Sequence, residues 1–93
     1  MQPENPIHKN IRVTGKVQGV GFRYHALHTA ARTGITGYVR NLAEGTVYME
    51  AEGSPAAVEE FILWCRQGPP RAWVDHLDIT EGMVVGYQKF LIK

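Results

Sequence analysis

Several features that mark common classes of protein are missing from this sequence. Cys65 is the only cysteine, so no disulfide can form within the chain and no set of cysteines is available to bind a metal ion. No apolar run is long enough to span a bilayer, and the polar residues 1–6 lack the apolar segment of a signal peptide. These absences predict a soluble cytoplasmic protein with no membrane partner.

The sequence also lacks an excess of charge of either sign. Ten basic and nine acidic residues leave a net charge of +1 at pH 7, which gives no electrostatic reason to expect a nucleic-acid partner. Hydrophobic residues, by contrast, make up 44% of the 93 positions, which is enough for one folded domain with a modest core. We expect that domain to span residues 9–93, after a flexible tail at residues 1–8.

Hydrophobic periodicity predicts two helices and five strands. The first helix, over residues 22–33, has apolar residues at helical spacing. The second helix begins after Ser54, a favourable N-cap residue, and ends at residues 68–70. Its apolar stripe includes Cys65, which we therefore expect in the core. Strands are expected at about residues 9–17, 36–42, 46–52, 74–80 and 87–93.

This order of elements, β-α-β-β-α-β with one further strand, predicts an α+β two-layer sandwich. We expect the ferredoxin-like arrangement, with a five-stranded, mostly antiparallel sheet and two helices on one of its faces. Because this fold hosts many unrelated functions, the function must be argued from particular residues.

The most informative stretch is Gly15–Arg23, with the sequence GKVQGVGFR. It runs from the end of the first strand through a glycine-containing loop into the first helix. Gly19 and Gly21 can adopt positive φ, which lets successive backbone N–H groups turn toward one point, and the helix start adds unpaired N–H donors. We therefore expect the loop backbone to form a cradle for a phosphoryl group. Its members are Gln18, Gly19, Val20, Gly21 and Phe22.

Arg23 is the candidate side chain for holding the anion. Its planar guanidinium group can donate hydrogen bonds to two oxygens of one phosphate. A cation at a helix start opposes the helix dipole, so a bound anion would explain its position. A surface arginine without a ligand is the alternative that the residues alone leave open.

Asn41 is the candidate for holding the attacking water. Asparagine is depleted in strands, yet Asn41 lies near the end of the second expected strand. Its amide can donate to one oxygen and accept from another, so it can orient a water without transferring a proton. The alternative is a structural role at the entry to the turn at residues 43–45.

The histidines and aromatic residues offer weaker candidates. His25 and His28 share a helix face, but no third metal ligand is apparent, and His25 is also within reach of the pocket as a general base. We expect both to be surface residues instead. Tyr38, Trp73 and Tyr87 are expected to pack rather than to stack on bases, because the third strand lacks the aromatic pattern of RNA-recognition motifs.

Four segments resemble the acylphosphatase family. Residues 15–23 are similar to the family signature G-x-V-Q-G-V-x-F-R, and residues 34–42, GITGYVRNL, are similar to its second motif, G-x-x-G-[WY]-V-x-N. The segment EGTV at residues 44–47 and the ending at residues 90–92 also match the family in spacing. The resemblance extends from about residue 11 to the last residue.

The resemblance implies an enzyme that hydrolyses the carboxyl-phosphate bond of acyl phosphates to a carboxylate and inorganic phosphate. It makes Arg23 the phosphate-binding arginine and Asn41 the residue that positions water for in-line attack, with no metal and no other cofactor. The expected partner is a small acyl phosphate, and we expect a monomer. Gly21 stands where the family often has a bulkier residue, which predicts a more flexible loop.

Two other functions stay open at this point. One is a non-catalytic anion-binding module, the role that such domains have within larger maturation proteins. The other is an RNA-binding domain of ferredoxin-like fold. The lack of zinc-finger cysteines disfavours the first, and the balanced charge disfavours the second.

Overall fold

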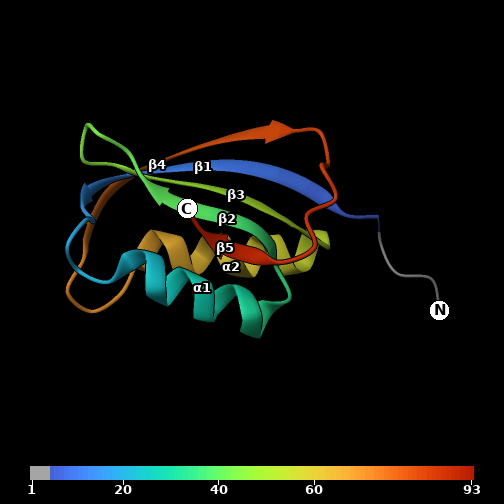
Figure 1. Ribbon diagram of the computed structural model, residues 1–93, viewed down its shortest axis with the longest axis horizontal. Helices are drawn as coiled ribbons and strands as arrows, with labels where there is room; N and C mark the ends of the chain where they lie inside the picture. Colours follow the sequence, from blue (N-terminus) through green and yellow to red (C-terminus); the bar gives the residue numbers. More distant parts are fainter. Residues whose placement is uncertain (1–4) are drawn as a thin grey trace.

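The computed structural model describes residues 5–93 (Figure 1). Its elements are β1 (Ile7–Lys16), α1 (Phe22–Thr33), β2 (Thr36–Asn41), β3 (Val47–Gly53), α2 (Pro55–Gln67), β4 (Trp73–Gly82) and β5 (Phe90–Ile92). The first helix has the predicted bounds. The second follows Ser54, whose Oγ accepts a hydrogen bond from the backbone N–H of Ala57. Neither helix in this part of the chain is long and apolar enough to cross a membrane.

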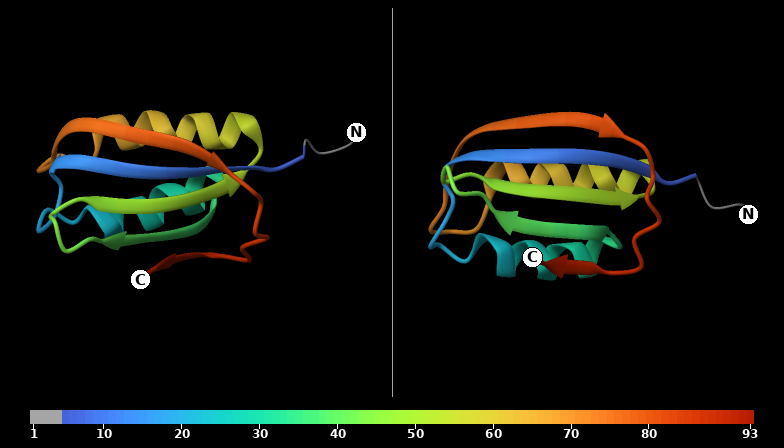
Figure 2. Two further views of the ribbon diagram at one scale, coloured as in Figure 1. Left: turned by 90° about the horizontal axis from the view of Figure 1, so that it is seen from above. Right: turned by 45° about the horizontal axis from the view of Figure 1, so that its top comes forward.

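The five strands form one sheet in the order β4-β1-β3-β2-β5. Neighbouring strands are antiparallel except β2 and β5, which run parallel. Both helices cover the same face of the sheet, so within residues 5–93 the other face carries no helix (Figure 2). The predicted α+β sandwich with a mostly antiparallel, five-stranded sheet is confirmed.

The core lies between the sheet and the two helices. Alternate strand residues point into it, as Ile11 and Val13 of β1 do, because successive side chains of a strand face opposite sides. The buried side chains of the helices are Phe22, Thr29, Val58, Phe61, Cys65 and the alanines at positions 26 and 30. Burying each large apolar side chain contributes roughly 1.5–3 kcal/mol. This packing fixes α1 on the sheet and with it the loop that precedes the helix.

The first strand begins earlier than the sequence predicts. We expected a flexible tail over residues 1–8, but Ile7 and His8 belong to β1. His8 is 5% exposed, and its Nδ1 lies 2.6 Å from Oε2 of Glu52 on β3. The tail prediction is therefore wrong for these two residues, because a buried partner distant in sequence orders them. Residues 1–4 of the expected tail lie outside the described part of the chain.

The segment 83–89 connects the two edge strands, β4 and β5, across one end of the sheet (Figure 2). Glu52 holds it there. The carboxylate accepts three backbone hydrogen bonds, from Val85 at 2.6 Å, Gly86 at 3.0 Å and Tyr87 at 3.2 Å. These contacts hold residues 85–87 away from the hydrogen bonds between β2 and β5, so β5 begins only at Phe90. The strand expected over residues 87–93 is therefore shorter than predicted.

The sheet face without helices carries a cluster of tyrosines. The hydroxyls of Tyr38, Tyr48 and Tyr87 all donate hydrogen bonds to the carboxylate of Glu50. The rings of Tyr38 and Tyr87 also pack edge-on, with centroids 6.0 Å apart, as expected of packing residues. Trp73, at the start of the edge strand β4, is 70% exposed, so the packing prediction is wrong for this residue. Only one side of an edge strand has a neighbouring strand.

Candidate active site

The loop between β1 and α1 has the geometry that its glycines predict. Gly19 and Gly21 have φ angles of 74° and 79°, in the left-handed region that residues with a Cβ rarely adopt. Within residues 5–93, no backbone N–H of residues 18–21 donates to a backbone or side-chain acceptor. These donors are therefore free for an anion, which is the property that such backbone concavities use.

The start of α1 adds to the positive character of the loop. Gly21 is the N-cap residue, and it has no side chain that accepts a hydrogen bond from the first turn. That turn contains no acidic residue, so no carboxylate compensates the positive end of the helix dipole. The first-turn N–H groups thus keep their capacity to bind an anion.

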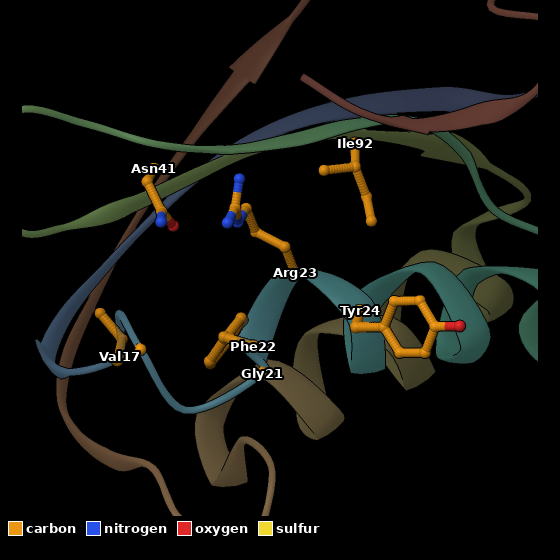
Figure 3. Close-up of a pocket in the computed structure, with 8 residues that line it drawn as sticks. Val17, Gly21, Phe22, Arg23, Tyr24, Asn41 and Ile92 are labelled. Atoms are coloured by element: carbon orange, nitrogen blue, oxygen red, sulfur yellow. The ribbon is translucent and has the colours of Figure 1, made fainter.

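Arg23 extends from the first turn of α1 toward the end of β2 (Figure 3). In this view its guanidinium group lies between Asn41 and Ile92. No carboxylate within residues 5–93 forms a salt bridge with it. An exposed guanidinium group without a counter-ion, next to free N–H donors, is suited to hold a phosphoryl group.

Asn41 is the last residue of β2 and pairs with Val47 of β3. It follows the buried Val39 by two positions, so its side chain points to the same face, toward the helices. Its amide forms no hydrogen bond with another group of residues 5–93. Because side chains alternate along β2, the amide of Asn41 lies on the same side of the sheet as Arg23.

These groups line a single cavity of about 220 Å³. The lining residues are Val17, Gly19, Gly21, Phe22, Arg23, Tyr24, Asn41 and Ile92. The structure therefore brings Arg23 and Asn41 together with three of the five residues expected in the cradle. The other two, Gln18 and Val20, do not line the cavity, and Val20 is buried in the core.

The side chain of Gln18 has a contact that sequence reasoning missed. Its Nε2 donates hydrogen bonds to the carbonyl oxygens of Leu42 and Thr46, at 2.8 and 2.9 Å. Both carbonyls belong to the turn between β2 and β3, directly after Asn41. The contact joins the loop to the strand end that carries Asn41. No local signal reveals it, because the partners lie 24 and 28 positions further along the chain.

The remaining candidates lie outside the cavity. His25 borders the loop, since a Cβ built on Gly21 would lie 3.5 Å from its Cδ2, and His28 packs edge-on against the ring of Tyr24. Residues 5–93 contain no group of three or more His, Cys, Asp or Glu side chains that could hold a metal ion. Burial raises the pKa of the Cys65 thiol far above its ordinary value, so this residue is unsuited to act as a nucleophile.

Comparisons with known proteins agree with this geometry. The sequence model of the family described as Acylphosphatase matches residues 9–92. An acylphosphatase from Nocardioides sp. is 44% identical over 84 residues, which cover 90% of this chain and 85% of that protein. The structure of an acylphosphatase from Coxiella burnetii superposes with a TM-score of 0.92 at 34% identity, covering 96% of this chain and 94% of that one. Part of the HypF structure from T. kodakarensis is also similar, with a TM-score of 0.83 at 31% identity over 94% of this chain and 12% of HypF.

Proposed function

The chain belongs to the acylphosphatase family and is an acylphosphatase, a hydrolase, and from this premise we propose how its residues act. Arg23 and the backbone N–H groups of residues 18–22 hold the phosphoryl group of an acyl phosphate. Asn41 positions the water that attacks it in line. The products are a carboxylate and inorganic phosphate, and the reaction uses no cofactor.

The reaction makes modest demands on the enzyme. The leaving group is a carboxylate whose conjugate acid has a pKa of roughly 4, so it departs without a proton from a general acid. What remains is to hold the phosphoryl group, to stabilise its charge as bonds change, and to place a water opposite the leaving oxygen. An arginine with free backbone donors and one neutral amide is sufficient for these tasks.

The proposed sequence of events follows from these roles. Two phosphoryl oxygens accept hydrogen bonds from the guanidinium group of Arg23, and a third accepts from the loop N–H groups. The amide oxygen of Asn41 accepts a hydrogen bond from the water, whose lone pair is then directed at phosphorus. The new P–O bond forms as the bond between phosphorus and the acyl oxygen breaks, and the water proton passes to a phosphate oxygen.

The observation that carries the proposal concerns one cavity. Its lining includes an arginine without a counter-ion, the N–H groups of Gly19 and Gly21 without acceptors, and an asparagine amide without a partner, all judged within residues 5–93. The test is an absorbance assay of benzoyl phosphate hydrolysis with Arg23→Ala and Asn41→Ala. Each variant should lower kcat/KM at least about 100-fold, the usual cost of removing one transition-state donor.

Arg32→Ala is the matched control for this assay. It removes an exposed arginine from the last turn of the same helix, so activity should stay within about twofold of the parent. Near-parental activity of folded Arg23→Ala or Asn41→Ala would overturn the assignment of that residue.

We further propose that the enzyme acts as a monomer on a small acyl phosphate in the cytoplasm. The single cysteine and the balanced charge are the sequence features that support this expectation. Light scattering coupled to size exclusion should give a mass near 10.4 kDa. A stable mass of twice that value would contradict the monomer.

A further inference from the structure

We propose that Tyr24 and Ile92 form the surface that receives the acyl group of the substrate, and that this surface makes the enzyme favour aromatic or branched apolar acyl groups over the acetyl group. The proposal rests on the proposed function, because it takes the phosphoryl group to lie beside Arg23. It supplies a basis for substrate selection. The loop and Asn41 provide none, since they act on the phosphoryl group that every acyl phosphate shares.

Tyr24 and Ile92 reach the cavity from two different elements. Tyr24 follows Arg23 on α1, where successive residues are roughly 100° apart around the axis, so it lies beside the arginine rather than behind it. Ile92 of β5 pairs with Val39 of β2, two positions before Asn41. Both residues line the cavity that also contains the proposed phosphate and water sites. The ring of Tyr24 extends away from Gly21 and Asn41, on the side where Ile92 lies (Figure 3).

Both side chains expose apolar surface that is already in position. Tyr24 is 63% exposed and Ile92 is 40% exposed. Single exposed apolar residues are ordinary on protein surfaces, but here two of them border the same cavity as Arg23, a cation with no carboxylate partner in the described part of the chain. His28 packs edge-on against the ring of Tyr24 with centroids 4.9 Å apart, and pairing with β2 holds Ile92. Little side-chain freedom is therefore lost when an acyl group binds.

The size of the cavity places the acyl group on this surface. Its volume of about 220 Å³ is smaller than the roughly 300–1,000 Å³ of pockets that enclose a drug-sized ligand. With the phosphoryl group fixed by Arg23 and the loop, the acyl group lies at the mouth of the cavity, beside Tyr24 and Ile92. An aromatic or branched group there removes apolar area from water, whereas an acetyl group is too short to cover it. The enzyme selects acyl groups by the apolar contact they make with Tyr24 and Ile92, and it does not exclude small ones. Acetyl phosphate is therefore still a substrate, but a poorer one.

The test compares kcat/KM for benzoyl phosphate and acetyl phosphate in the parent, Tyr24→Ala and Tyr24→Phe. Loss of the ring should lower kcat/KM for benzoyl phosphate about 5- to 20-fold, toward the lower end of the effects seen in closed apolar pockets. The value for acetyl phosphate should change by less than about twofold. Tyr24→Phe should match the parent, because the ring and not the hydroxyl provides the contact.

Two further variants complete the experiment. Ile92→Ala should act in the same direction as Tyr24→Ala, with a larger effect on benzoyl phosphate than on acetyl phosphate. Leu63→Ala is the control, since it truncates a side chain on α2 that is 61% exposed and does not line the cavity, and it should change neither value.

Calorimetric binding of inorganic phosphate separates this inference from the assignment of the phosphate site. Phosphate has no acyl group, so Tyr24→Ala should bind it like the parent, whereas Arg23→Ala should lose binding. An equal loss of kcat/KM for both substrates in Tyr24→Ala, no loss for either, or weaker phosphate binding would overturn the acyl surface. Retained phosphate binding in folded Arg23→Ala would instead contradict the proposed function.

Discussion

At the scale of single residues, the mechanism depends on whether an ionising side chain takes the water proton. Asn41 carries an amide, which cannot act as a general base. His25 is the nearest alternative because it borders Gly21, but it does not line the cavity. Since a base must lie within hydrogen-bond reach of the proton it removes, the position of His25 disfavours that role.

His25→Gln should therefore leave kcat within a few-fold of the parent, far from the roughly 10²–10⁴-fold loss expected from deleting a general base. The measurement is kcat against pH across the neutral range for both proteins. An imidazole base produces a limb that falls as pH drops through about 6.5, the usual pKa of histidine. A limb present in the parent and absent in the variant, with a loss of that size, would show that the histidine is the base.

The sequence could point to residues whose type is unusual for their position. Arg23 opposes a helix dipole and Asn41 ends a strand, and the structure brings both to one cavity. Gln18, Tyr24 and Ile92 carry no such local signal. Their positions relative to the cavity depend on contacts between segments far apart in the chain, such as the pairing of β5 with β2.

At the scale of elements, the site depends on how the loop after β1 is attached to the turn after β2. The amide of Gln18 makes this connection with two hydrogen bonds to backbone carbonyls. One of them belongs to Thr46, which is buried. The loop carries the N–H donors and the strand end carries Asn41, so in the proposed mechanism this bridge sets the spacing between the phosphate and the water.

Gln18→Ala should lower kcat about 10- to 100-fold, because a small displacement of reacting groups is costly. It should also lower the free energy of unfolding by roughly 1–3 kcal/mol, since two hydrogen bonds worth roughly 0.5–1.5 kcal/mol each are lost, although each carbonyl keeps a backbone N–H donor. Benzoyl phosphate kinetics and urea unfolding measure the two effects.

Gln88→Ala is the control for this bridge. Within residues 5–93 the Gln88 amide donates only to the exposed carbonyl of Gly86, so both kcat and the free energy of unfolding should change little. A loss of stability in Gln18→Ala with unchanged kcat would show that the bridge serves the fold alone.

The position of β5 depends in turn on the segment 83–89 and on Glu52. Burial acts to raise the pKa of the Glu52 carboxyl, but the three N–H donors of this segment, first that of Val85, and the contact with His8 outweigh it and lower the pKa from 4.5. Burial acts to lower the pKa of His8, but its hydrogen bonds, first that with Glu52, and nearby carboxylates raise the pKa from 6.5. Folding therefore favours the carboxylate and the imidazolium.

Glu52→Gln should lower the free energy of unfolding by roughly 1–3 kcal/mol, and the loss should depend on pH. A carboxyl with a lowered pKa stabilises the fold above pH 4.5 and loses this contribution as pH falls through its folded pKa. A histidine with a raised pKa stabilises the fold below pH 6.5 and loses this contribution as pH rises through its folded pKa. The difference between parent and variant should thus be largest between pH 4.5 and 6.5.

Urea unfolding at a series of pH values measures this difference. Glu81→Gln is the control, because it removes an exposed contact with Lys9 and should have little effect on stability. A difference between the parent and Glu52→Gln that stays constant over the whole range would contradict an ionised pair.

The bounds of the elements differ in how well the sequence could predict them. The helix starting at Phe22 and the N-cap at Ser54 follow from local rules of periodicity and capping. The bounds of β1 and β5 do not, because Glu52 orders His8 at one strand and holds the segment before the other. Local sequence patterns near His8 or near residues 83–89 cannot predict a contact with a carboxylate that lies in the middle of the chain.

At the scale of the whole molecule, the proposed mechanism takes the positive field for the phosphoryl group from an arginine, a helix end and backbone donors that have no acceptor within residues 5–93. Residues 5–93 provide no cluster of side chains suited to a metal ion. We therefore expect activity to survive exhaustive treatment with EDTA, because the protein already supplies the charge that a metal would contribute. Loss of activity that one divalent ion restores would contradict the metal-free mechanism.

The overall architecture was predictable because the alternation of periodicities fixes the order of elements. The sheet order and the parallel pairing of β2 with β5 are long-range features that this order alone leaves open. The same topology makes the site possible. It brings the loop after β1, the end of β2 and the last strand to one cavity.

The central claim is that Arg23 binds the anion and Asn41 holds only the water. The most direct test is calorimetric titration of inorganic phosphate into Arg23→Ala and Asn41→Ala, with turnover of benzoyl phosphate measured on the same preparations. We predict that Asn41→Ala binds phosphate like the parent although its turnover falls at least about 100-fold, and that Arg23→Ala loses both. Loss of phosphate binding in folded Asn41→Ala, or its retention in Arg23→Ala, would contradict this division of roles.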